Sequence, residues 1–138
     1  MSIAAKGEEL VEDLGMFDNW DDKWSYVIDL GKAFPLMEDE FCTEDNIVYG
    51  CQNKVYIRSL FDGKNVHFEG NSEAMIPRGL LGLLIKVLGN EKPENILTAE
   101  LDFIDRAGIR DNLSMLRANG LEAMMRRMKL EAVKYIRN

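Results

Sequence analysis

The sequence holds few of the side chains that metal sites and disulfides are made from. It has two cysteines, Cys42 and Cys51, and a single histidine, His67. A zinc site or an iron–sulfur cluster usually takes three or four cysteine or histidine ligands, so we expect no metal site in this chain. We also expect no structural disulfide between the two cysteines, because disulfides rarely persist in a reducing cytoplasm. What remains is the possibility of a reactive thiol.

Long apolar runs are also missing. The longest, from Gly79 to Ile85, is far shorter than the roughly 20 residues that cross a bilayer. The first ten residues, MSIAAKGEEL, lack the basic and then apolar segments of a signal peptide. We therefore expect a cytoplasmic protein that does not act at a membrane. A chain of 138 residues is long enough for one domain with its own core, which we expect to span residues 1–138.

Basic residues are outnumbered, with 17 Lys and Arg against 24 Asp and Glu, for a net charge of −7. Nucleic-acid binding draws on clustered cations, so we expect no nucleic-acid partner. The imbalance lies in residues 1–45, with 13 acids against 3 bases, whereas residues 46–138 hold 11 acids against 14 bases. The acidic front is either a solvated helical face or a docking surface for a basic patch on a partner.

Apolar spacing predicts two helices in the acidic front. The first lies within residues 3–17, where Leu10, Val11, Leu14 and Phe17 form one stripe. Asn19 is a suitable N-cap for the second helix, and Pro35 is expected to end it. The buried face of this second helix is expected to hold Trp20, Trp24, Val27, Ile28 and Gly31.

Three further helices are expected after residue 70. Ser72 is a candidate N-cap for the first of them, which should end at Gly89–Asn90 with Pro77 near its start. After a short helical turn at residues 93–96, Thr98 is expected to cap a helix that Gly108 stops. The last helix should run roughly from Arg117 to Ile136 with one apolar stripe: Leu121, Met124, Met128, Ala132 and Tyr135.

Alternating apolar residues between these helices predict an antiparallel sheet of about three strands. Ile47 and Val48 suggest a short strand, Val55, Ile57 and Ser59 a longer one, and Val66 and Phe68 its return strand. Asp62–Gly63 suits a two-residue type I′ turn between the last two strands. The order α-α-β-β-β-α-α-α predicts an α+β fold, a small antiparallel sheet flanked by helices.

Cys51 stands out because it follows Gly50 at the tip of a turn within NIVYGCQNKVYI, residues 46–57. An ordinary thiol is only about 3 % thiolate at pH 7, and the thiolate is the nucleophile. A nearby cation would favour the anion, and the sequence offers four candidates: Lys54, Arg58, His67 and Arg117.

Three chemistries are open to a cysteine in this setting. Hydrolysis through a Cys–His pair needs His67 as the base, but His67 lies in a predicted strand on the polar side. A dithiol redox site needs Cys42 as the resolving partner, but the spacing is not that of a CxxC motif. Sulfur relay, in which the thiolate of Cys51 attacks the terminal sulfur of a persulfide on a donor protein, needs one cysteine, a mobile loop and a partner surface. We favour sulfur relay.

Several blocks of the sequence point in the same direction. They are WDDKWSYVIDLG from Trp20, NIVYGCQNKVYI from Asn46, residues 70–80, and LRANGLEAM from Leu116. Through these blocks, in this order, the chain resembles the SufE family of sulfur-acceptor proteins and its close relative CsdE. Asn53 stands where the family often has serine and Tyr56 where it often has tryptophan, and the branch, SufE or CsdE, stays open.

The resemblance implies a SufE-like α+β fold and a sulfur-transfer role in iron–sulfur cluster assembly. A SufS-like cysteine desulfurase, which carries pyridoxal phosphate, would form a persulfide that Cys51 accepts. The chain would stimulate that desulfurase and pass the sulfur to a cluster scaffold. By the same resemblance, Gly50 and Gln52 shape the loop, Glu73 affects pairing with the desulfurase, and Arg117 lies near the loop.

The resemblance also implies that this chain binds no cofactor itself. We expect a monomeric accessory protein rather than a stand-alone enzyme. The rival hypothesis is an acidic protein-interaction adaptor in which the cysteine is incidental. Because a persulfide exposed to water is lost to oxidation or to other thiols, we expect Cys51 to rest against apolar side chains and to swing out on docking.

Overall fold

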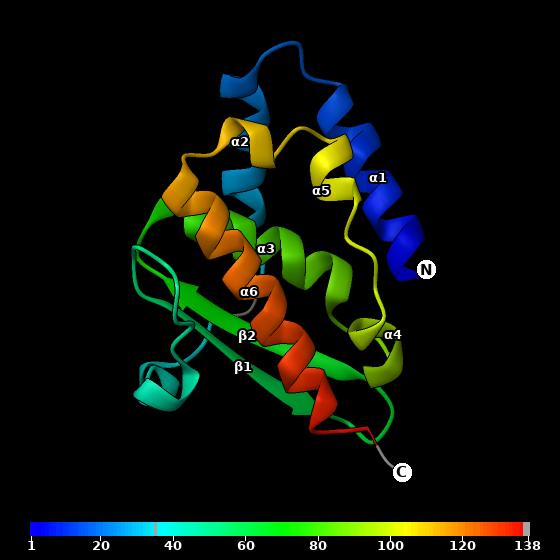
Figure 1. Ribbon diagram of the computed structural model, residues 1–138, viewed down its shortest axis with the longest axis vertical. Helices are drawn as coiled ribbons and strands as arrows, with labels where there is room; N and C mark the ends of the chain where they lie inside the picture. Colours follow the sequence, from blue (N-terminus) through cyan, green and yellow to red (C-terminus); the bar gives the residue numbers. More distant parts are fainter. Residues whose placement is uncertain (35, 137–138) are drawn as a thin grey trace.

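The computed structural model describes residues 1–34 and 36–136. Two helices precede a hairpin of two strands, and four helices follow it (Figure 1). The helices are α1 (Ile3–Gly15), α2 (Trp20–Leu30), α3 (Met75–Leu88), α4 (Pro93–Leu97), α5 (Phe103–Arg106) and α6 (Met115–Val133). The strands are β1 (Val55–Phe61) and β2 (Val66–Ser72). This arrangement confirms the predicted α+β fold.

The hairpin is antiparallel and packs one face against α3 and α6 (Figure 1). Its inward side chains are fully or almost fully buried and alternate with polar residues on the opposite face. They meet the apolar sides of α3 and α6 in the core, as the period-two pattern predicts. The inward residues are Val55, Ile57, Val66 and Phe68.

The second helix begins where the sequence predicts. The side chain of Asn19 accepts a hydrogen bond from the backbone N–H of Asp22 at 2.9 Å, which confirms it as the N-cap of α2. Helix α2 then packs along α3, and glycines let the two backbones approach closely. A Cβ at Gly82 would lie 2.3 Å from the carbonyl oxygen of Leu30.

The predicted third strand is wrong. Ile47 forms an isolated bridge with Tyr56, and the N–H of Val48 donates to the carbonyl of Val55 at 2.8 Å, but no strand is built around them within the described residues. A 3₁₀ turn, Glu44–Asn46, directly precedes this bridge, and the chain turns again at Gly50. These two turns leave too few extended residues for a ladder.

The predicted type I′ turn is also wrong. Phe61 pairs with Val66, so the hairpin loop has four residues, and only Gly63 among them has a positive φ, of 95°. The carboxylate of Asp62 accepts from the backbone N–H groups of Lys64 and Asn65, which fixes the wider loop instead.

Two predicted helix caps lie elsewhere. Ser72 ends β2, where it pairs with Val55, and Ala74 is the N-cap of α3. Thr98 closes α4, since its hydroxyl donates to the carbonyl of Glu94 at 2.9 Å, and does not start a helix. The predicted stops at Gly89–Asn90 and Gly108 are confirmed. The predicted role of Pro35 lies outside the described residues.

The final helix starts two residues before the predicted position and ends earlier, at Val133. Its predicted stripe is buried from Leu121 to Ala132, but Tyr135 follows the helix and is half-buried. Across residues 1–34 and 36–136, no helix has both the length and the apolar character that a bilayer crossing requires.

Candidate functional site

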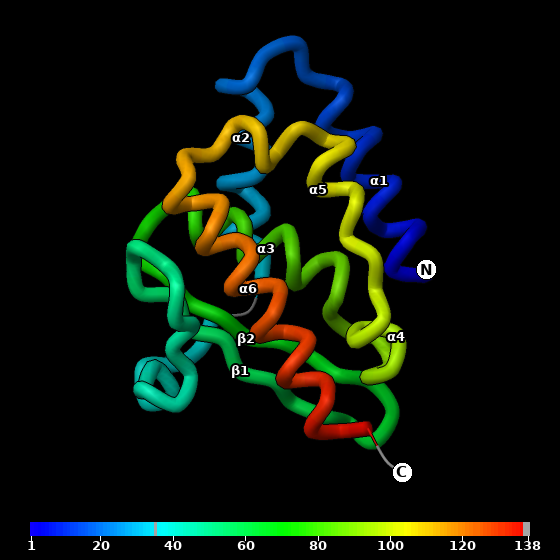
Figure 2. The backbone as a smooth tube through the Cα atoms, viewed as in Figure 1, coloured from blue at the N-terminus to red at the C-terminus, as the bar shows by residue number. Residues whose placement is uncertain are grey.

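The loop that joins the bridge at Ile47 to β1 passes beside the N-terminal half of α6 (Figure 2). It carries Cys51, whose thiol contacts Gly120 of that helix. Gly50 turns this loop with a φ of 103°, a conformation that favours glycine. A Cβ added at Gly50 would lie 3.2 Å from the Cβ of Ala123 on α6. Gly50 therefore meets two demands, a left-handed turn and a close approach to the helix.

The side chain of Cys51 enters a small hollow between α3 and α6. Pro77 and Leu80 of α3 line one side, and Leu116 and Met124 of α6 the other. The hollow has a volume of about 10 Å³, near the lower limit for one water molecule. Cys51 is only half-buried, but its neighbours are largely apolar. This arrangement matches the expected resting position of the thiol.

Gly120 completes the floor of this hollow. The thiol of Cys51 donates a hydrogen bond to the carbonyl oxygen of Gly120, with a sulfur–oxygen distance of 3.6 Å. A Cβ at Gly120 would lie 3.4 Å from the sulfur. Because Gly120 has no side chain, there is space beside the helix for the sulfur of Cys51.

Burial raises the pKa of the Cys51 thiol above its ordinary value. The raised pKa keeps the thiol protonated at neutral pH in the isolated chain. A protonated thiol is a poor nucleophile, so we expect the resting thiol to react slowly.

Of the four cationic side chains considered as activators, Arg117 lines the same hollow as Cys51. Arg58 instead pairs with Glu69 and lies over the ring of Phe41. His67 pairs with Asp62 at 2.8 Å beside the hairpin loop. Lys54 lines a different groove. The structure therefore leaves Arg117 as the cation at the thiol.

Arg117 sits in the first turn of α6, where its backbone N–H donates to the hydroxyl of Ser114 at 3.2 Å. Its guanidinium makes no ion pair within the part of the chain that the structure describes, and the residue is exposed. A cation at a helix N-terminus is unfavourable to the helix, so the position suits an interaction outside the chain.

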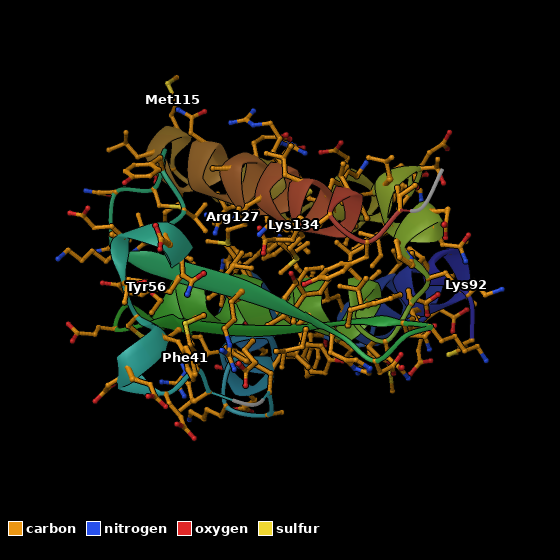
Figure 3. The ribbon with its side chains drawn as sticks, turned by 90° about the horizontal axis from the view of Figure 1, so that it is seen from below. Phe41, Tyr56, Lys92, Met115, Arg127 and Lys134 are labelled. Atoms are coloured by element: carbon orange, nitrogen blue, oxygen red, sulfur yellow. The ribbon has the colours of Figure 1, made fainter. Side chains whose placement is uncertain are left out.

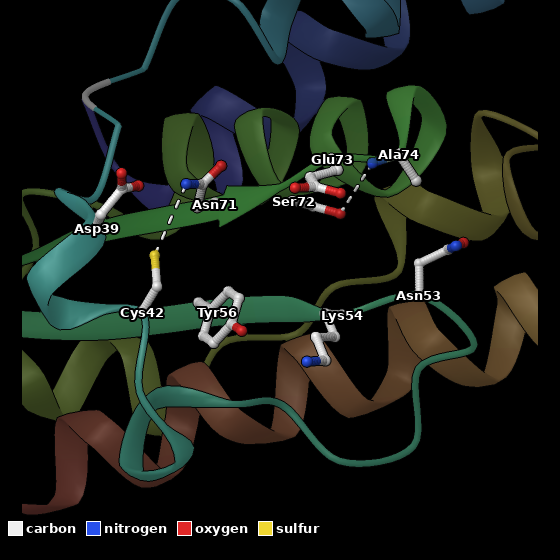
Figure 4. A pocket seen from close by; sticks show the side chains of 9 residues that line it. All are labelled: Asp39, Cys42, Asn53, Lys54, Tyr56, Asn71, Ser72, Glu73 and Ala74. Carbon is white, nitrogen blue, oxygen red and sulfur yellow. Dashed lines mark hydrogen bonds between the residues drawn. The ribbon is translucent and has the colours of Figure 1, made fainter.

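Glu73 lies away from the hollow. It is exposed between β2 and α3, one residue before the N-cap Ala74, so it lies outside the helix. Its side chain lines an open groove of about 500 Å³ on the polar side of the hairpin (Figure 4). Asn53 borders both this groove and the hollow of Cys51, so the two openings are neighbours.

Cys42 lies at the far end of this groove from Asn53 (Figure 4). Its thiol donates to the carbonyl of Glu38 and accepts from the side-chain amide of Asn71, each at 3.7 Å. Both cysteines are free thiols. Within the described residues, no three His, Cys, Asp or Glu side chains gather as a metal site would need.

Sequence reasoning missed the residues that form the hollow. It placed Met124 in an apolar helical stripe and gave Leu80 and Gly120 as members of the sequence blocks. One signal was present, because a glycine in the interior of a helix lowers helix stability and usually has a packing reason. The packing reason is the sulfur of Cys51.

Comparison with known proteins decides the family. The family model described as "SufE: Fe-S metabolism associated domain" matches residues 8–132. The chain belongs to the SufE family. An uncharacterized SufE-like protein of Rhizobium meliloti is 35 % identical over 130 residues, covering 91 % of this chain and 93 % of the relative. An uncharacterized SufE-like protein of Rhizobium etli is 33 % identical over 130 residues, covering 91 % and 88 %.

A solved structure supports the fold independently. The solution structure of a hypothetical protein from Thermus thermophilus superimposes with a TM-score of 0.79, covering 94 % of each chain at 21 % identity. At that identity the likeness shows the fold alone. Membership of the SufE family connects this chain with iron–sulfur metabolism in general.

Proposed function

We propose that this SufE-family chain is a cytoplasmic sulfur acceptor in iron–sulfur cluster assembly. Cys51 takes the persulfide sulfur of a SufS-like cysteine desulfurase, and the chain stimulates that enzyme and passes the sulfur to a cluster scaffold. The observation that carries the proposal is the resting state of Cys51, a loop cysteine whose thiol lies in a small, largely apolar hollow lined by Arg117. Pyridoxal phosphate belongs to the desulfurase.

The transfer is a thiol–disulfide exchange with a persulfide as the electrophile. The thiolate of Cys51 attacks the terminal sulfur of the donor persulfide. A new S–S bond forms on Cys51 while the S–S bond of the donor breaks, and the donor cysteine leaves as a thiolate. The proton lost from Cys51 restores that donor thiol, so the step needs no outside oxidant or reductant.

Activation requires Cys51 to leave its hollow. Once the sulfur is out of its apolar surroundings, the desolvation that raises its pKa is relieved and the thiolate becomes accessible. Arg117, unpaired within the described chain, is placed to favour a negative charge on the sulfur at the mouth of the hollow. Docking of the desulfurase thus raises the thiolate fraction of a cysteine that is otherwise mainly protonated.

The test measures sulfide release by the desulfurase with cysteine as substrate. Wild-type chain is expected to raise the turnover rate, and Cys51→Ala to remove that stimulation. Cys42→Ala is the matched control and should stimulate like wild type. If Cys51→Ala stimulates as well as wild type, the proposed role of Cys51 is wrong.

The same assay addresses the adaptor hypothesis. Asp21 and Asp22 are exposed near the start of α2 and make no contact with the Cys51 hollow. The adaptor hypothesis predicts that reversing these two charges abolishes function while Cys51→Ser retains it. Our proposal predicts instead that Cys51→Ser abolishes the stimulation of the desulfurase.

A further inference from the structure

The loop around Cys51 has a firmly held base and a loosely held tip. The tip, residues 49–54, makes one hydrogen bond to the rest of the described chain, the weak one from the Cys51 thiol to Gly120. The base is different, because Val48 is buried and its N–H bonds the carbonyl of Val55. Something must hold the base still if the tip moves.

Arg127 of α6 binds both arms of this base. Its guanidinium donates to the carbonyl oxygens of Ile47 at 2.8 Å and Asp45 at 2.7 Å, on the arm before Cys51. It also approaches the carbonyl of Ile57 in β1, on the arm after Cys51, at 3.5 Å. In Figure 3, Arg127 lies between α6 and the hairpin. One planar cation therefore joins the two arms to α6.

Arg127 is itself held in place by buried polar groups. Its Nε lies 3.3 Å from a carboxylate oxygen of Glu131, whose side chain is only 6 % exposed. The other carboxylate oxygen of Glu131 accepts from the hydroxyl of Ser59 in β1 at 2.9 Å. Hydrogen bonds to a charged group are stronger than those between neutral groups, so these contacts hold the Arg127 guanidinium in one position.

We propose that Arg127 is a positioning residue for the acceptor loop. By fastening residues 45–47 and β1 to α6, it places Cys51 over Gly120 of the same helix and confines loop opening to residues 49–54. The proposal rests on the proposed function, in which Cys51 must leave its hollow and return. Arg127 does not touch the reacting sulfur.

The test compares Arg127→Met with Arg126→Met. Each change removes one positive charge from adjacent positions on α6, but Arg126 is exposed and makes none of the hydrogen bonds described for Arg127. Two readouts are followed in the isolated chain. One is the alkylation rate of Cys51 by iodoacetamide, with Cys42 replaced by alanine, and the other is amide hydrogen exchange over residues 44–58.

We call the hydrogen bonds of Arg127 to Asp45, Ile47 and Ile57 the clamp. Its loss in Arg127→Met is expected to raise the alkylation rate of Cys51 by about tenfold and to speed exchange at residues 46–48 by a similar factor. Arg126→Met should stay within about twofold of wild type. A merely structural role would lower the unfolding temperature without changing reactivity at temperatures far below it. Equal alkylation and exchange rates for the two variants would overturn the proposal.

Arg127→Lys decides the question if Arg127→Met does not fold. It keeps the charge, but a single ammonium on a shorter stem cannot reach both the Asp45 and the Ile47 carbonyls in the same geometry. An increase of about threefold in Cys51 alkylation is expected, between the values for wild type and for loss of the clamp. Wild-type rates for Arg127→Lys would then overturn the proposal.

These readouts need no desulfurase, so the two proposals can fail separately. If Cys51 never gains sulfur but Arg127→Met still speeds alkylation, the positioning role of Arg127 is supported and the proposed function is wrong. If Cys51 gains sulfur and is alkylated at the wild-type rate in both variants, the proposed function is supported and the positioning role of Arg127 is wrong.

Discussion

The reactivity of Cys51 depends on surroundings that keep its thiol neutral. Burial raises the thiol pKa, so the folded chain holds less thiolate at pH 7 than an unfolded one does. By linkage, the stability that this thiol contributes is complete below the ordinary thiol pKa and is lost as the pH rises through the higher folded value. Because the thiolate is the reactive form, a mainly protonated Cys51 should react more slowly with small oxidants.

The alkylation rate of Cys51 should therefore rise with pH along a curve displaced to higher pH. The reference is a synthetic peptide of residues 46–57, in which the same cysteine is fully solvated. We expect the midpoint for the folded chain to lie above that of the peptide, and the rate at pH 7 to be lower than that of the peptide. A midpoint at or below that of the peptide would show that burial does not control this thiol.

Gly120 offers a second test at the residue level. A Cβ there makes ordinary contact with the sulfur at 3.4 Å, so Gly120→Ala should fold and gain roughly 0.5–1 kcal/mol of unfolding free energy from better helix propensity. The same methyl group takes room in a hollow of about 10 Å³, so a second sulfur on Cys51 would fit less well. We expect a more stable protein that accumulates less persulfide.

Gly15→Ala is the matched control for that experiment. Gly15 ends α1 and has nothing within 4 Å of its would-be Cβ. It should change stability without changing persulfide accumulation. If Gly120→Ala loads sulfur as well as Gly15→Ala does, the space beside Gly120 has no part in holding the sulfur.

At the scale of the elements, α2 and α3 pack with their backbones in close contact. A Cβ at Gly82 would lie 2.3 Å from the Leu30 carbonyl oxygen and 2.8 Å from the Gly31 nitrogen, both rigid backbone atoms. Gly82→Ala is therefore expected to lower the unfolding free energy by about 1–3 kcal/mol despite its better helix propensity. Chemical denaturation measures this, and an unchanged or higher unfolding free energy would contradict the packing described.

The helices and the hairpin were predictable because each rests on a local pattern. Asn19 caps α2 through its own side chain, and the alternation around Ile57 and Phe68 gives the strands. Where tertiary contacts decide, the predictions failed. Ser72 has the chemistry of a cap, but its register opposite Val55 keeps it in β2, and α3 begins at Met75.

The site likewise has parts that follow from local sequence and parts that depend on tertiary contacts. The position of Cys51 on a turn after Gly50 was readable from the sequence, and so was the family resemblance. The hollow was not, because it is assembled from α3 and α6, whose lining residues Pro77 to Met124 lie 26 to 73 residues after Cys51 along the chain. Arg127 was invisible for the same reason, since its partners are backbone carbonyls, which carry no sequence signal.

At the scale of the whole molecule, the Cys51 hollow is lined by residues that follow the acidic first part of the chain, residues 1–45. The Cys51 hollow opens at the N-terminal end of α6, where Leu116 is 55 % exposed and Arg117 is free of ion pairs within the described chain. Aspartates 21 and 22 lie instead in the acidic first part of the chain. The single domain over residues 1–138 and the monomeric state remain predictions.

The most direct measurement of the central claim is the mass of Cys51 after reaction. The chain is incubated with its SufS-like desulfurase, pyridoxal phosphate and cysteine, and then digested and read by mass spectrometry without reductant. We predict that the peptide holding Cys51 gains the mass of one sulfur atom, that the peptide holding Cys42 does not, and that reductant removes the gain. No added sulfur on Cys51 under conditions in which the desulfurase is active would contradict the account.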